Sequence, residues 1–397
     1  MVLPLLFGNI NEVQTTSTEI KLTHTIKEGS MALTLGFSMH RVESRLRSIA
    51  GLCLLALVGV SLVAGQPGLR DWQRSPAVVE LDTAADIYAV GDVHGDYDRL
   101  AALLAGAGVI RGVPASPDRP EWNAGSSVLV FTGDLIDKGP KDLAVLTLVR
   151  ALPVVAARSG GRVVVLMGNH EAEFLAHPDA SKGADFAAQL SAAGLRPQDV
   201  AACSGELGGF LCSLPFATRI GDWFFSHAGN TDGRTIGQLS SDLTRAVDHD
   251  GFAAVQLIGP GSILEARLGE KGGNGRSWFD VANPRTDPAK QLMAYASALG
   301  AQHIVEGHQH GATRFPDSAV RSSGEMFNWR GSLFLIDTGM SRQIDDSEGA
   351  ILHVRQAAGY AVGVCPDGHE TPIWEARQSN QSAAMPPCRS RDSKPKP

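Results

Sequence analysis

The stretch SSVLVFTGDLIDKG, residues 126–139, ends a run of apolar residues with two carboxylates in a glycine-flanked turn. Its valine, leucine and phenylalanine residues predict a buried strand over residues 127–131. Gly133 allows the backbone to turn sharply after this strand, so that Asp134 and Asp137 lie in the turn. A glycine and an aspartate after one strand are usual in a turn. The stretch therefore indicates a functional site only if other strands end in the same way.

Four other segments repeat this arrangement of an apolar run followed by a polar turn. They are residues 91–95 (GDVHG), 168–171 (GNHE), 226–229 (SHAG) and 307–310 (GHQH). Because α/β folds present ligands at the ends of their strands, we expect the five turns to share one crevice. Their carboxylates, amide and imidazoles, without sulfur, form a ligand set that suits Mn, Fe or Zn better than a soft metal.

Short β-rich runs alternate with helical patterns along the rest of the chain, which predicts an α/β fold of layered sheets and helices. Further strands are expected over residues 87–90, 163–166, 223–226, 303–306 and 333–336, and helices over 97–105, 141–156 and 288–299.

Composition divides the chain into a main domain and flanking segments. We expect a linker over residues 66–84 and the main domain over 85–375. Residues 178–215 are rich in alanine and are typical of a small helical insertion. Residues 376–397 are rich in Ser, Gln, Pro and Lys, a composition that predicts a disordered tail.

An apolar segment over residues 48–65 follows a polar extension, residues 1–47, that ends in several arginines. A basic flank, an apolar core and small residues at its end are the features of a signal peptide or a membrane anchor. We therefore expect export to the periplasm or another extracytoplasmic compartment, with membrane contact only through this segment. Met31 or Met39 would place the basic flank near the chain start, so we expect the first 30 to 38 residues to come from an over-long gene prediction.

Four cysteines follow the apolar segment, an even number that is compatible with two disulfides in an exported chain. Sequence alone leaves three pairings open, of which Cys203 with Cys212 and Cys365 with Cys388 close the shortest loops. The net charge is −7, and no block of Lys or Arg forms a basic groove. This distribution disfavours nucleic acid as a partner.

The series of five motifs resembles the calcineurin-like metallophosphoesterase superfamily. Within it, residues 85–345 are most similar to the phosphoprotein phosphatase branch, particularly to bacterial Shewanella-like phosphatases. The resemblance implies a β-sandwich of two mixed sheets flanked by helices, with two divalent or trivalent metal ions at the sheet edge.

Matching motif to motif, the resemblance also implies a role for each side chain. Asp92 and His94 would bind the first metal, Asp134 would bridge both metals, and Asn169, His227 and His308 would bind the second. His310 occupies a position that completes the first metal site in the wider superfamily. His170 would donate a proton to the leaving group, and Asp137 would orient His170.

The family pattern has an arginine where this chain has Lys138, which offers a point charge in place of a bidentate fork. Lys138 would still bind the substrate phosphate, and Arg276 would supply the missing fork. Asp337, in the strand expected after the last metal motif, is expected to be structural.

These roles predict a two-metal phosphatase that hydrolyses a phosphomonoester, on a phosphoprotein or a small molecule, through attack by a metal-bound hydroxide. The alternative within the same chemistry is a dinucleoside polyphosphate or cyclic-nucleotide phosphodiesterase, because residues 133–140 also resemble bacterial diadenosine tetraphosphatases. A more remote alternative is an inactive metal-binding scaffold, although the motifs lack none of the ligands.

Overall fold

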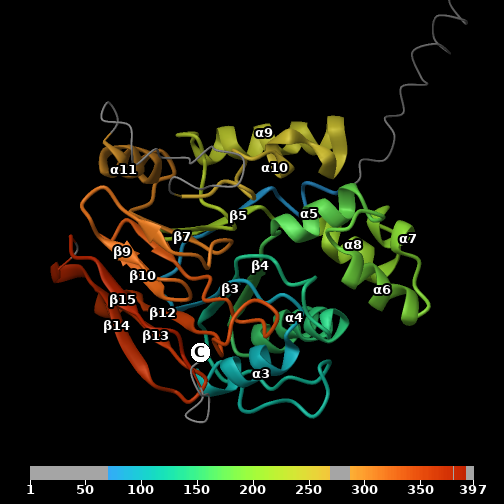
Figure 1. The fold of residues 1–397 in the computed structure, drawn as a ribbon, viewed down its shortest axis with the longest axis horizontal. Coiled ribbons are helices and arrows are strands. Elements are labelled where there is room, and N and C mark those ends of the chain that lie inside the picture. The colour runs from blue at the N-terminus through green and yellow to red at the C-terminus, as the bar shows by residue number, and fades with distance from the viewer. Residues whose placement is uncertain (1–69, 269–286, 379, 390–397) are drawn as a thin grey trace, which may run out of the picture. The chain divides into compact units, whose positions relative to one another are not determined.

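Two mixed β-sheets pack face to face in the computed structural model, which describes residues 70–268, 287–378 and 380–389 (Figure 1). The six-stranded sheet has the order β14-β13-β12-β2-β3-β4. Its bounds are β2 (Ile87–Val90), β3 (Val128–Phe131), β4 (Arg162–Val165), β12 (Ile351–Arg355), β13 (Tyr360–Val364) and β14 (Glu370–Glu375). Strands β2, β3 and β4 are parallel, so the motifs that follow them emerge at one edge of the sheet.

The second sheet has seven strands in the order β1-β5-β6-β7-β11-β10-β15. Its bounds are β1 (Val78–Leu81), β5 (Ala217–Ile220), β6 (Trp223–Ser226), β7 (His303–Glu306), β10 (Met326–Trp329), β11 (Leu333–Leu335) and β15 (Ala383–Met385). Strands β6 and β7 are parallel and adjacent, which brings the motifs at residues 226–229 and 307–310 together. A separate short ribbon pairs β8 (Thr313–Arg314) with β9 (Val320–Arg321).

Helices cover the outer faces of the two sheets (Figure 1). Beside the six-stranded sheet lie α3 (Tyr97–Gly106) and α4 (Asp142–Ala157), and beside the seven-stranded sheet lie α9 (Ile236–Asp250), α10 (Val255–Ile258) and α11 (Pro288–Ala298). Helix α5 (Asn169–Ala176) precedes α6 (Ala184–Ala192), α7 (Pro197–Ala201) and α8 (Gly205–Ser213). Three 3-10 turns, η2 (Gly251–Ala253), η3 (Gln356–Ala358) and η4 (Ala376–Gln378), complete the described elements.

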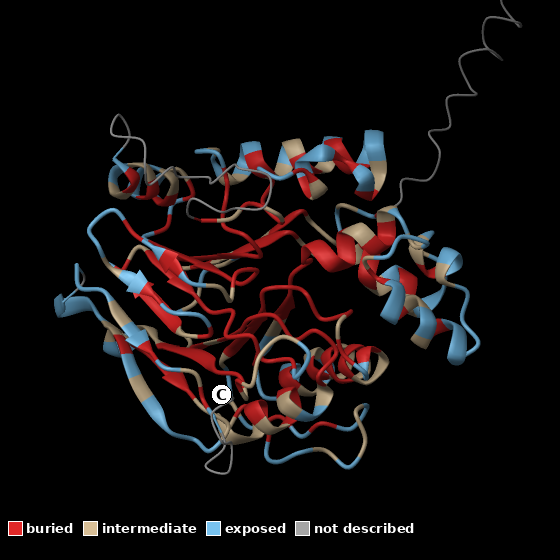
Figure 2. Cartoon of the chain, in the orientation of Figure 1, coloured by how far each residue is buried: buried red, intermediate tan, exposed pale blue. Residues whose placement is uncertain are grey.

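The strands at the centre of the sandwich are buried on both faces (Figure 2). In β3, Val128 and Val130 pack between the sheets with residues such as Phe225, whereas Leu129 and Phe131 pack toward the helices. This alternation follows from the two-residue period of a strand. Strands with two apolar faces appear in the sequence as continuous hydrophobic runs, which is why these strands could be predicted.

The predicted fold class is confirmed: two mixed sheets form a sandwich flanked by helices. Residues 178–215 contain the three helices α6, α7 and α8. Disulfides join Cys203 to Cys212 and Cys365 to Cys388, the shortest-loop pairing of the three that the sequence left open.

Two flanking segments differ from the expectation. The expected linker, residues 66–84, contains β1, which pairs in parallel with β5 and is preceded by a buried Arg70 that donates to the carbonyl of Leu214 (2.7 Å). The expected disordered tail, residues 376–397, contains β15, which pairs with β10, and Cys388, which the disulfide holds to Cys365. Strands of three or four residues offer too little pattern to outweigh a polar composition, but sheet pairing and a covalent bond order them.

Within the described residues, no helix is both long and apolar enough to cross a membrane. The expected signal peptide or anchor at 48–65, the polar extension at 1–47, Arg276 and residues 390–397 all lie outside the described residues.

Candidate metal centre

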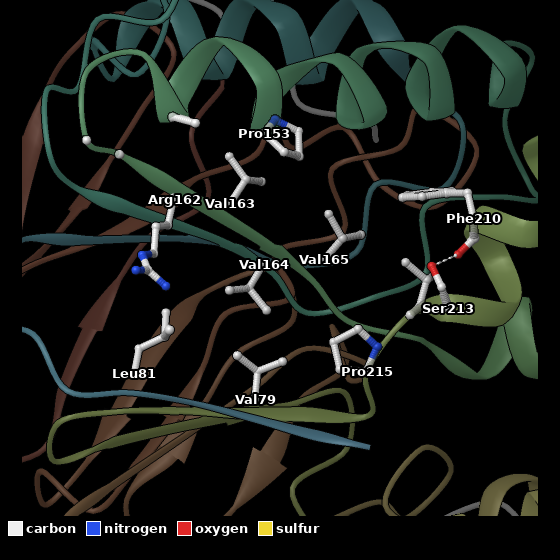
Figure 3. A pocket seen from close by; sticks show the side chains of 14 residues that line it. Val79, Leu81, Pro153, Arg162, Val163, Val164, Val165, Phe210, Ser213 and Pro215 are labelled. Carbon is white, nitrogen blue, oxygen red and sulfur yellow. Dashed lines mark hydrogen bonds between the residues drawn. The ribbon is translucent and has the colours of Figure 1, made fainter. Parts of the chain in front are cut away.

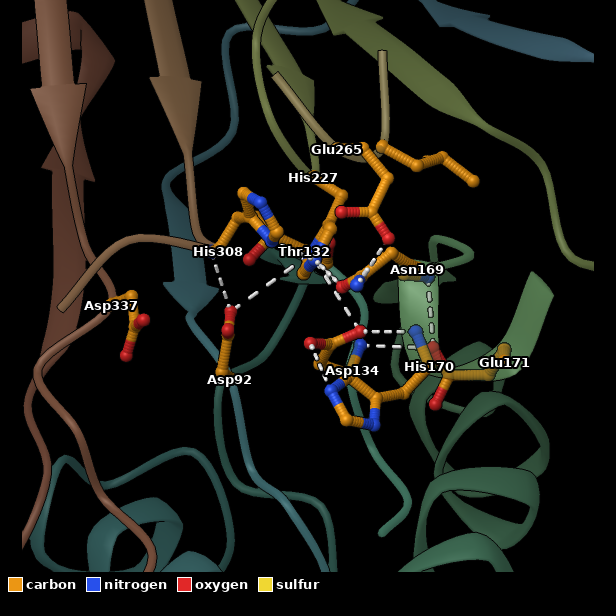
Figure 4. A network of polar contacts seen from close by, with 12 residues as sticks. Asp92, Thr132, Asp134, Asn169, His170, Glu171, His227, Glu265, His308 and Asp337 are labelled. Atoms are coloured by element: carbon orange, nitrogen blue, oxygen red, sulfur yellow. Dashed lines mark hydrogen bonds and ion pairs between the residues drawn. The ribbon is translucent and has the colours of Figure 1, made fainter. Parts of the chain in front are cut away.

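The five predicted turns meet at the edge of the sandwich where β2, β3, β4, β6 and β7 end (Figure 4). Parallel strands place their carboxyl ends on the same side, so side chains far apart in sequence become neighbours. Four of the five turns, all except residues 226–229, border a cavity of about 140 Å³. Its lining consists of Asp92, His94, Asp134, Lys138, Asn169, His170, Lys182, Arg267, His308, His310, Asp337 and Ile344.

The first group of ligand atoms surrounds the Nε2 atom of His94. This atom lies 3.6 Å from Asp134 Oδ2 and 3.8 Å from Asp92 Oδ2. The Nδ1–H of His94 donates to the carbonyl of Ile136 (3.2 Å), which leaves the lone pair on Nε2 facing the carboxylates. Burial lowers the pKa of His94 to about 4, so the ring is neutral and able to bind a cation.

The second group surrounds Nε2 of His227. The Nδ1–H of this ring donates to the carbonyl of Thr132 (2.9 Å), so the Nε2 lone pair points into the site. Nε2 lies 2.9 Å from Asn169 Oδ1, 3.1 Å from His308 Nδ1 and 3.3 Å from Asp134 Oδ1. These atoms all offer lone pairs, and such a cluster is stable only when a positive charge lies among them.

The titration of the second group points the same way. Burial lowers the pKa of His227, but the carboxylates of Asp134 and Asp92 raise it more, to about 10. In the protein alone, a proton on Nε2 of His227 therefore supplies the positive charge among these lone pairs. Because the donor set consists of carboxylate, amide oxygen and imidazole, the residues fit a pair of metal ions of the Mn, Fe or Zn type.

Asp134 connects the two groups. Burial would raise its pKa, but His227 and His170 lower it well below the usual range, so the side chain is a carboxylate. One of its oxygens faces His94 and the other faces His227. Among the described residues, two sets of His and Asp side chains could hold a metal, and both include Asp134. This is the geometry that a bridging carboxylate requires.

Asp92 lies between the same groups. Its Oδ1 accepts from the backbone N–H of His308 (2.9 Å) and lies 3.9 Å from His227 Nδ1. Burial and the neighbouring carboxylate of Asp337 raise the pKa of Asp92 well above the usual range. The structure thus brings together six of the seven side chains predicted to hold two metals, the seventh being His310.

Glu171 fixes the backbone of the bridging turn, a role that the sequence reasoning missed. Its two carboxylate oxygens accept from the N–H groups of Asp134 (2.9 Å), Leu135 (2.8 Å), Ile136 (3.2 Å) and Gly168 (2.8 Å). A glutamate in the first turn of α5 was the available signal, because such a residue commonly bonds free backbone N–H groups.

Backbone strain is concentrated at the site. Of the nine non-glycine residues with positive φ in the described part of the chain, five belong to the motifs predicted to bind metal and phosphate: His94, Asp134, Asp137, Lys138 and His308. Gly133 has a φ of +106° and lies so close to Gly168 that a Cβ atom would approach its backbone nitrogen to 2.4 Å. Such conformations persist when the surroundings force them, and they cluster at functional sites.

His170 and Asp137 form a buried pair beside Asp134. His170 Nδ1 lies 2.9 Å from Asp137 Oδ2, and His170 Nε2 lies 3.9 Å from Asp134 Oδ2. Burial would raise the pKa of Asp137, but its contact with His170 lowers it. Asp137 thus orients the His170 ring with its Nε2 atom toward the two groups of ligand atoms. His170 is also in one of the two sets that could hold a metal, so its role as proton donor stays a prediction.

Three basic side chains line the cavity. Lys138 was predicted, whereas Lys182 and Arg267 were missed. Lys182 precedes α6, and Arg267 lies in the loop after α10, where its Nη1 donates to the carbonyl of His308 (3.2 Å). Neither residue belongs to a motif, and only the packing of its loop brings it to the site.

His310 and Asp337 lie at one side of the cavity. His310 Nδ1 is 3.9 Å from Asp337 Oδ2, and the His310 side chain is 41% exposed. His310 belongs to neither of the two sets around Asp134, so its role as a ligand remains a prediction. Asp337, expected to be structural, is buried and lines the cavity near Asp92.

A larger hollow of about 650 Å³ lies between the edge strands β1 and β4 (Figure 3). Its side chains are apolar apart from Arg162 and Ser213, and the Ser213 hydroxyl donates to the carbonyl of Phe210 (2.7 Å). It lacks a group of titratable side chains, so the chemistry belongs to the smaller, polar cavity.

Residues 85–312, more than half of the chain, match the family model of calcineurin-like phosphoesterases. Shewanella-like protein phosphatase 2 of Arabidopsis thaliana is 36% identical over 85 residues, 21% of this chain and 20% of that protein. The symmetrical bis(5'-nucleosyl)-tetraphosphatase of Cronobacter sakazakii is 38% identical over 89 residues, 22% of this chain and 24% of that protein. The chain therefore spans about a quarter or less of the length of these relatives.

Solved structures share the fold at low identity. A cold-active protein-tyrosine phosphatase of a Shewanella species has a TM-score of 0.53 at 22% identity, covering 75% of this chain and 82% of that one. A protein serine/threonine phosphatase of Saccharomyces cerevisiae has a TM-score of 0.51 at 18% identity, covering 82% and 88%. With a matching family model, the predicted sandwich and the five converging motifs, this chain belongs to the calcineurin-like phosphoesterase family.

Proposed function

We propose that the chain hydrolyses phosphomonoesters, carried by a phosphoprotein or a small molecule, in a reaction that needs two metal ions of the Mn, Fe or Zn type. The observation that carries this proposal is the convergence on Asp134 of two buried groups of ligand atoms. Asp92 and His94 would hold the first ion, Asn169, His227 and His308 the second, and Asp134 both. Two ions held in this way lower the pKa of a shared water and neutralise phosphate oxygens.

The other side chains of the cavity supply binding and proton transfer. Lys138 and Arg267 provide positive charge for the phosphate oxygens. His170 donates a proton to the leaving oxygen, and Asp137 holds the ring in position for this step. Water and phosphate ester thereby become alcohol and inorganic phosphate, with the proton from His170 going to the alcohol.

The dimensions and charge of the cavity favour a monoester. A phosphorylated side chain carries about −1.5 to −2 charge at neutral pH, which Lys138, Arg267 and two metal ions would neutralise. A diester carries less charge and has a second organic group, for which a cavity of about 140 Å³ leaves little room. The similarity to a bis(5'-nucleosyl)-tetraphosphatase supports dinucleoside polyphosphates as the second candidate substrate.

The test compares p-nitrophenyl phosphate, bis-p-nitrophenyl phosphate and diadenosine tetraphosphate as substrates of protein loaded with Mn²⁺, with Asp134→Asn as the inactive control. We expect the monoester to turn over fastest and Asp134→Asn to lose both metal and activity. Faster turnover of the diester or the dinucleotide would contradict the monoesterase assignment. Metal binding without turnover of any substrate would indicate an inactive scaffold.

We also propose that the protein is exported, with residues 48–65 as a signal peptide or membrane anchor. The two disulfides support this proposal, because disulfides persist mainly in oxidising compartments. Fusing a reporter that is active only after export behind residue 70 tests it, and N-terminal sequencing of the mature protein distinguishes cleavage from retention. A fusion that is expressed stably but shows no reporter activity would contradict export.

A further inference from the structure

We propose that Glu265 is a positioning residue, which holds the Asn169 side chain with its carbonyl oxygen toward the second metal position and is itself held by Lys182. This inference rests on the proposed function, because it assigns Asn169 Oδ1 as a metal ligand. Glu265 and Lys182 lie outside the five motifs, and both were found only from the structure.

The Asn169 amide has different neighbours on its two sides (Figure 4). Its Oδ1 lies 2.9 Å from His227 Nε2, and its Nδ2 donates to Glu265 Oε1 (2.7 Å). The oxygen can bind a cation, whereas the NH₂ group has no free lone pair for one. A flip of the amide would turn the NH₂ group toward the metals and the oxygen toward a carboxylate.

Glu265 discriminates between these two orientations because a carboxylate only accepts hydrogen bonds. It favours the orientation in which Nδ2 faces it, and that orientation directs Oδ1 into the site. The Glu265 side chain is 17% exposed, so bulk water competes little for this contact.

Lys182 keeps Glu265 in place. Its ammonium donates to the same Oε1 atom (3.0 Å) and also pairs with Glu173 of α5. Three segments are thereby linked through one oxygen atom: the start of α5, the loop before α6 and the loop after α10.

The experiment follows Mn²⁺ binding by calorimetry to chelator-treated protein, for the wild type, Glu265→Ala, Glu265→Gln and a matched control. Glu206→Ala is the control, because Glu206 pairs with Arg150 at the surface of the helical insertion and its side chain is 89% exposed. Loss of a residue that orients a metal ligand typically weakens metal binding 10- to 100-fold.

We expect the wild type to bind two equivalents of Mn²⁺. Glu265→Ala should weaken the affinity for one equivalent of Mn²⁺ by about 10- to 100-fold and leave the affinity for the other within about twofold of the wild type. Glu265→Gln regains much of the affinity, because its amide oxygen can still accept from Asn169 Nδ2. Glu206→Ala matches the wild type.

Replacing Asn169 separates positioning from general packing. A carboxylate has two equivalent oxygens and needs no orientation, so Glu265→Ala added to Asn169→Asp should no longer weaken binding. An equal loss in both backgrounds, or two unchanged equivalents in both Glu265→Ala and Glu265→Gln, would overturn the positioning role. A wild-type protein that binds no metal would instead refute the proposed function, and this proposal with it.

Discussion

His170 is the residue whose predicted role can be separated most cleanly from metal binding. Its Nδ1 lies 2.9 Å from Asp137 and its Nε2 lies 3.9 Å from Asp134, so the ring is held by Asp137 and also belongs to one of the two sets that could hold a metal. We predict that His170→Asn lowers turnover of p-nitrophenyl phosphate by about 10²- to 10⁴-fold, because the leaving oxygen loses its acid. Metal content, measured by mass spectrometry, should stay near two equivalents. Normal turnover would refute the acid role, and loss of one metal would make His170 a ligand.

Asp142 gives a prediction about pH and stability. It begins α4, is fully buried and accepts from Gln189 Nε2 (2.9 Å). Burial raises its pKa from 3.8 to about 8. Between these two values the folded protein holds a proton that the unfolded chain has lost, so the contribution of Asp142 to stability falls as pH rises toward 8.

An asparagine mimics the protonated acid and removes this dependence. Asp142→Asn should therefore raise stability at pH 8 by on the order of 2–5 kcal/mol and change it little at pH 4. Denaturant unfolding of both proteins at the two pH values measures the difference. An equal effect at both values would show that the carboxyl does not titrate between them.

The residues that the sequence identified share one property: they follow apolar runs within short local motifs. Asp92, Asp134 and His227 could be found in this way because each lies directly after the strand that positions it. Glu265 and Lys182 could not, because their approach to Asn169 depends on how two loops pack. Arg276 was predicted as the phosphate arginine, but it lies outside the described residues, while Arg267 lines the cavity.

At the scale of elements, predictability depends on burial. Strands β2, β6 and β7 have the predicted bounds, and all four residues of β6 and of β7 are buried. Strand β14 has one buried residue, Ile373, among exposed and partly buried ones, and β15 has three residues, so neither gives a clear hydrophobic run. These two strands are held by pairing with β13 and β10, and no local sequence pattern predicts this pairing.

The Cys365–Cys388 disulfide holds the segment after β15 to the end of β13. We predict that Cys365→Ser combined with Cys388→Ser lowers the free energy of unfolding by about 2–4 kcal/mol, because the unfolded chain loses a closed loop. The double variant Cys203→Ser, Cys212→Ser opens a shorter loop, of separation 9 against 23, and should cost less. Thermal unfolding compares the two, and an unchanged melting temperature for the first variant would show that pairing of β15 alone orders the tail.

At the scale of the whole molecule, the site is a property of the sandwich. Asp92, Asp134 and Asn169 follow strands of one sheet, whereas His227 and His308 follow strands of the other. The strand order and the packing of the two sheets could be inferred only from the family resemblance, because no residue pattern specifies which strands are neighbours.

Ligands drawn from both sheets imply that metal binding stabilises the folded sandwich. At a free Mn²⁺ concentration 100 times the dissociation constant, each site contributes about 2.7 kcal/mol to the free energy of unfolding. We predict that Mn²⁺ raises the melting temperature by several degrees in the wild type and by much less in Asp134→Asn. Equal shifts in both proteins would mean that the ions bind elsewhere.

The most direct test of the two-metal centre is anomalous diffraction from crystals grown with Mn²⁺. Two peaks should lie on either side of the Asp134 carboxylate, about 3.5–4 Å apart, one beside Asp92 and His94 and the other beside Asn169, His227 and His308. A map without anomalous density among these side chains would contradict the account.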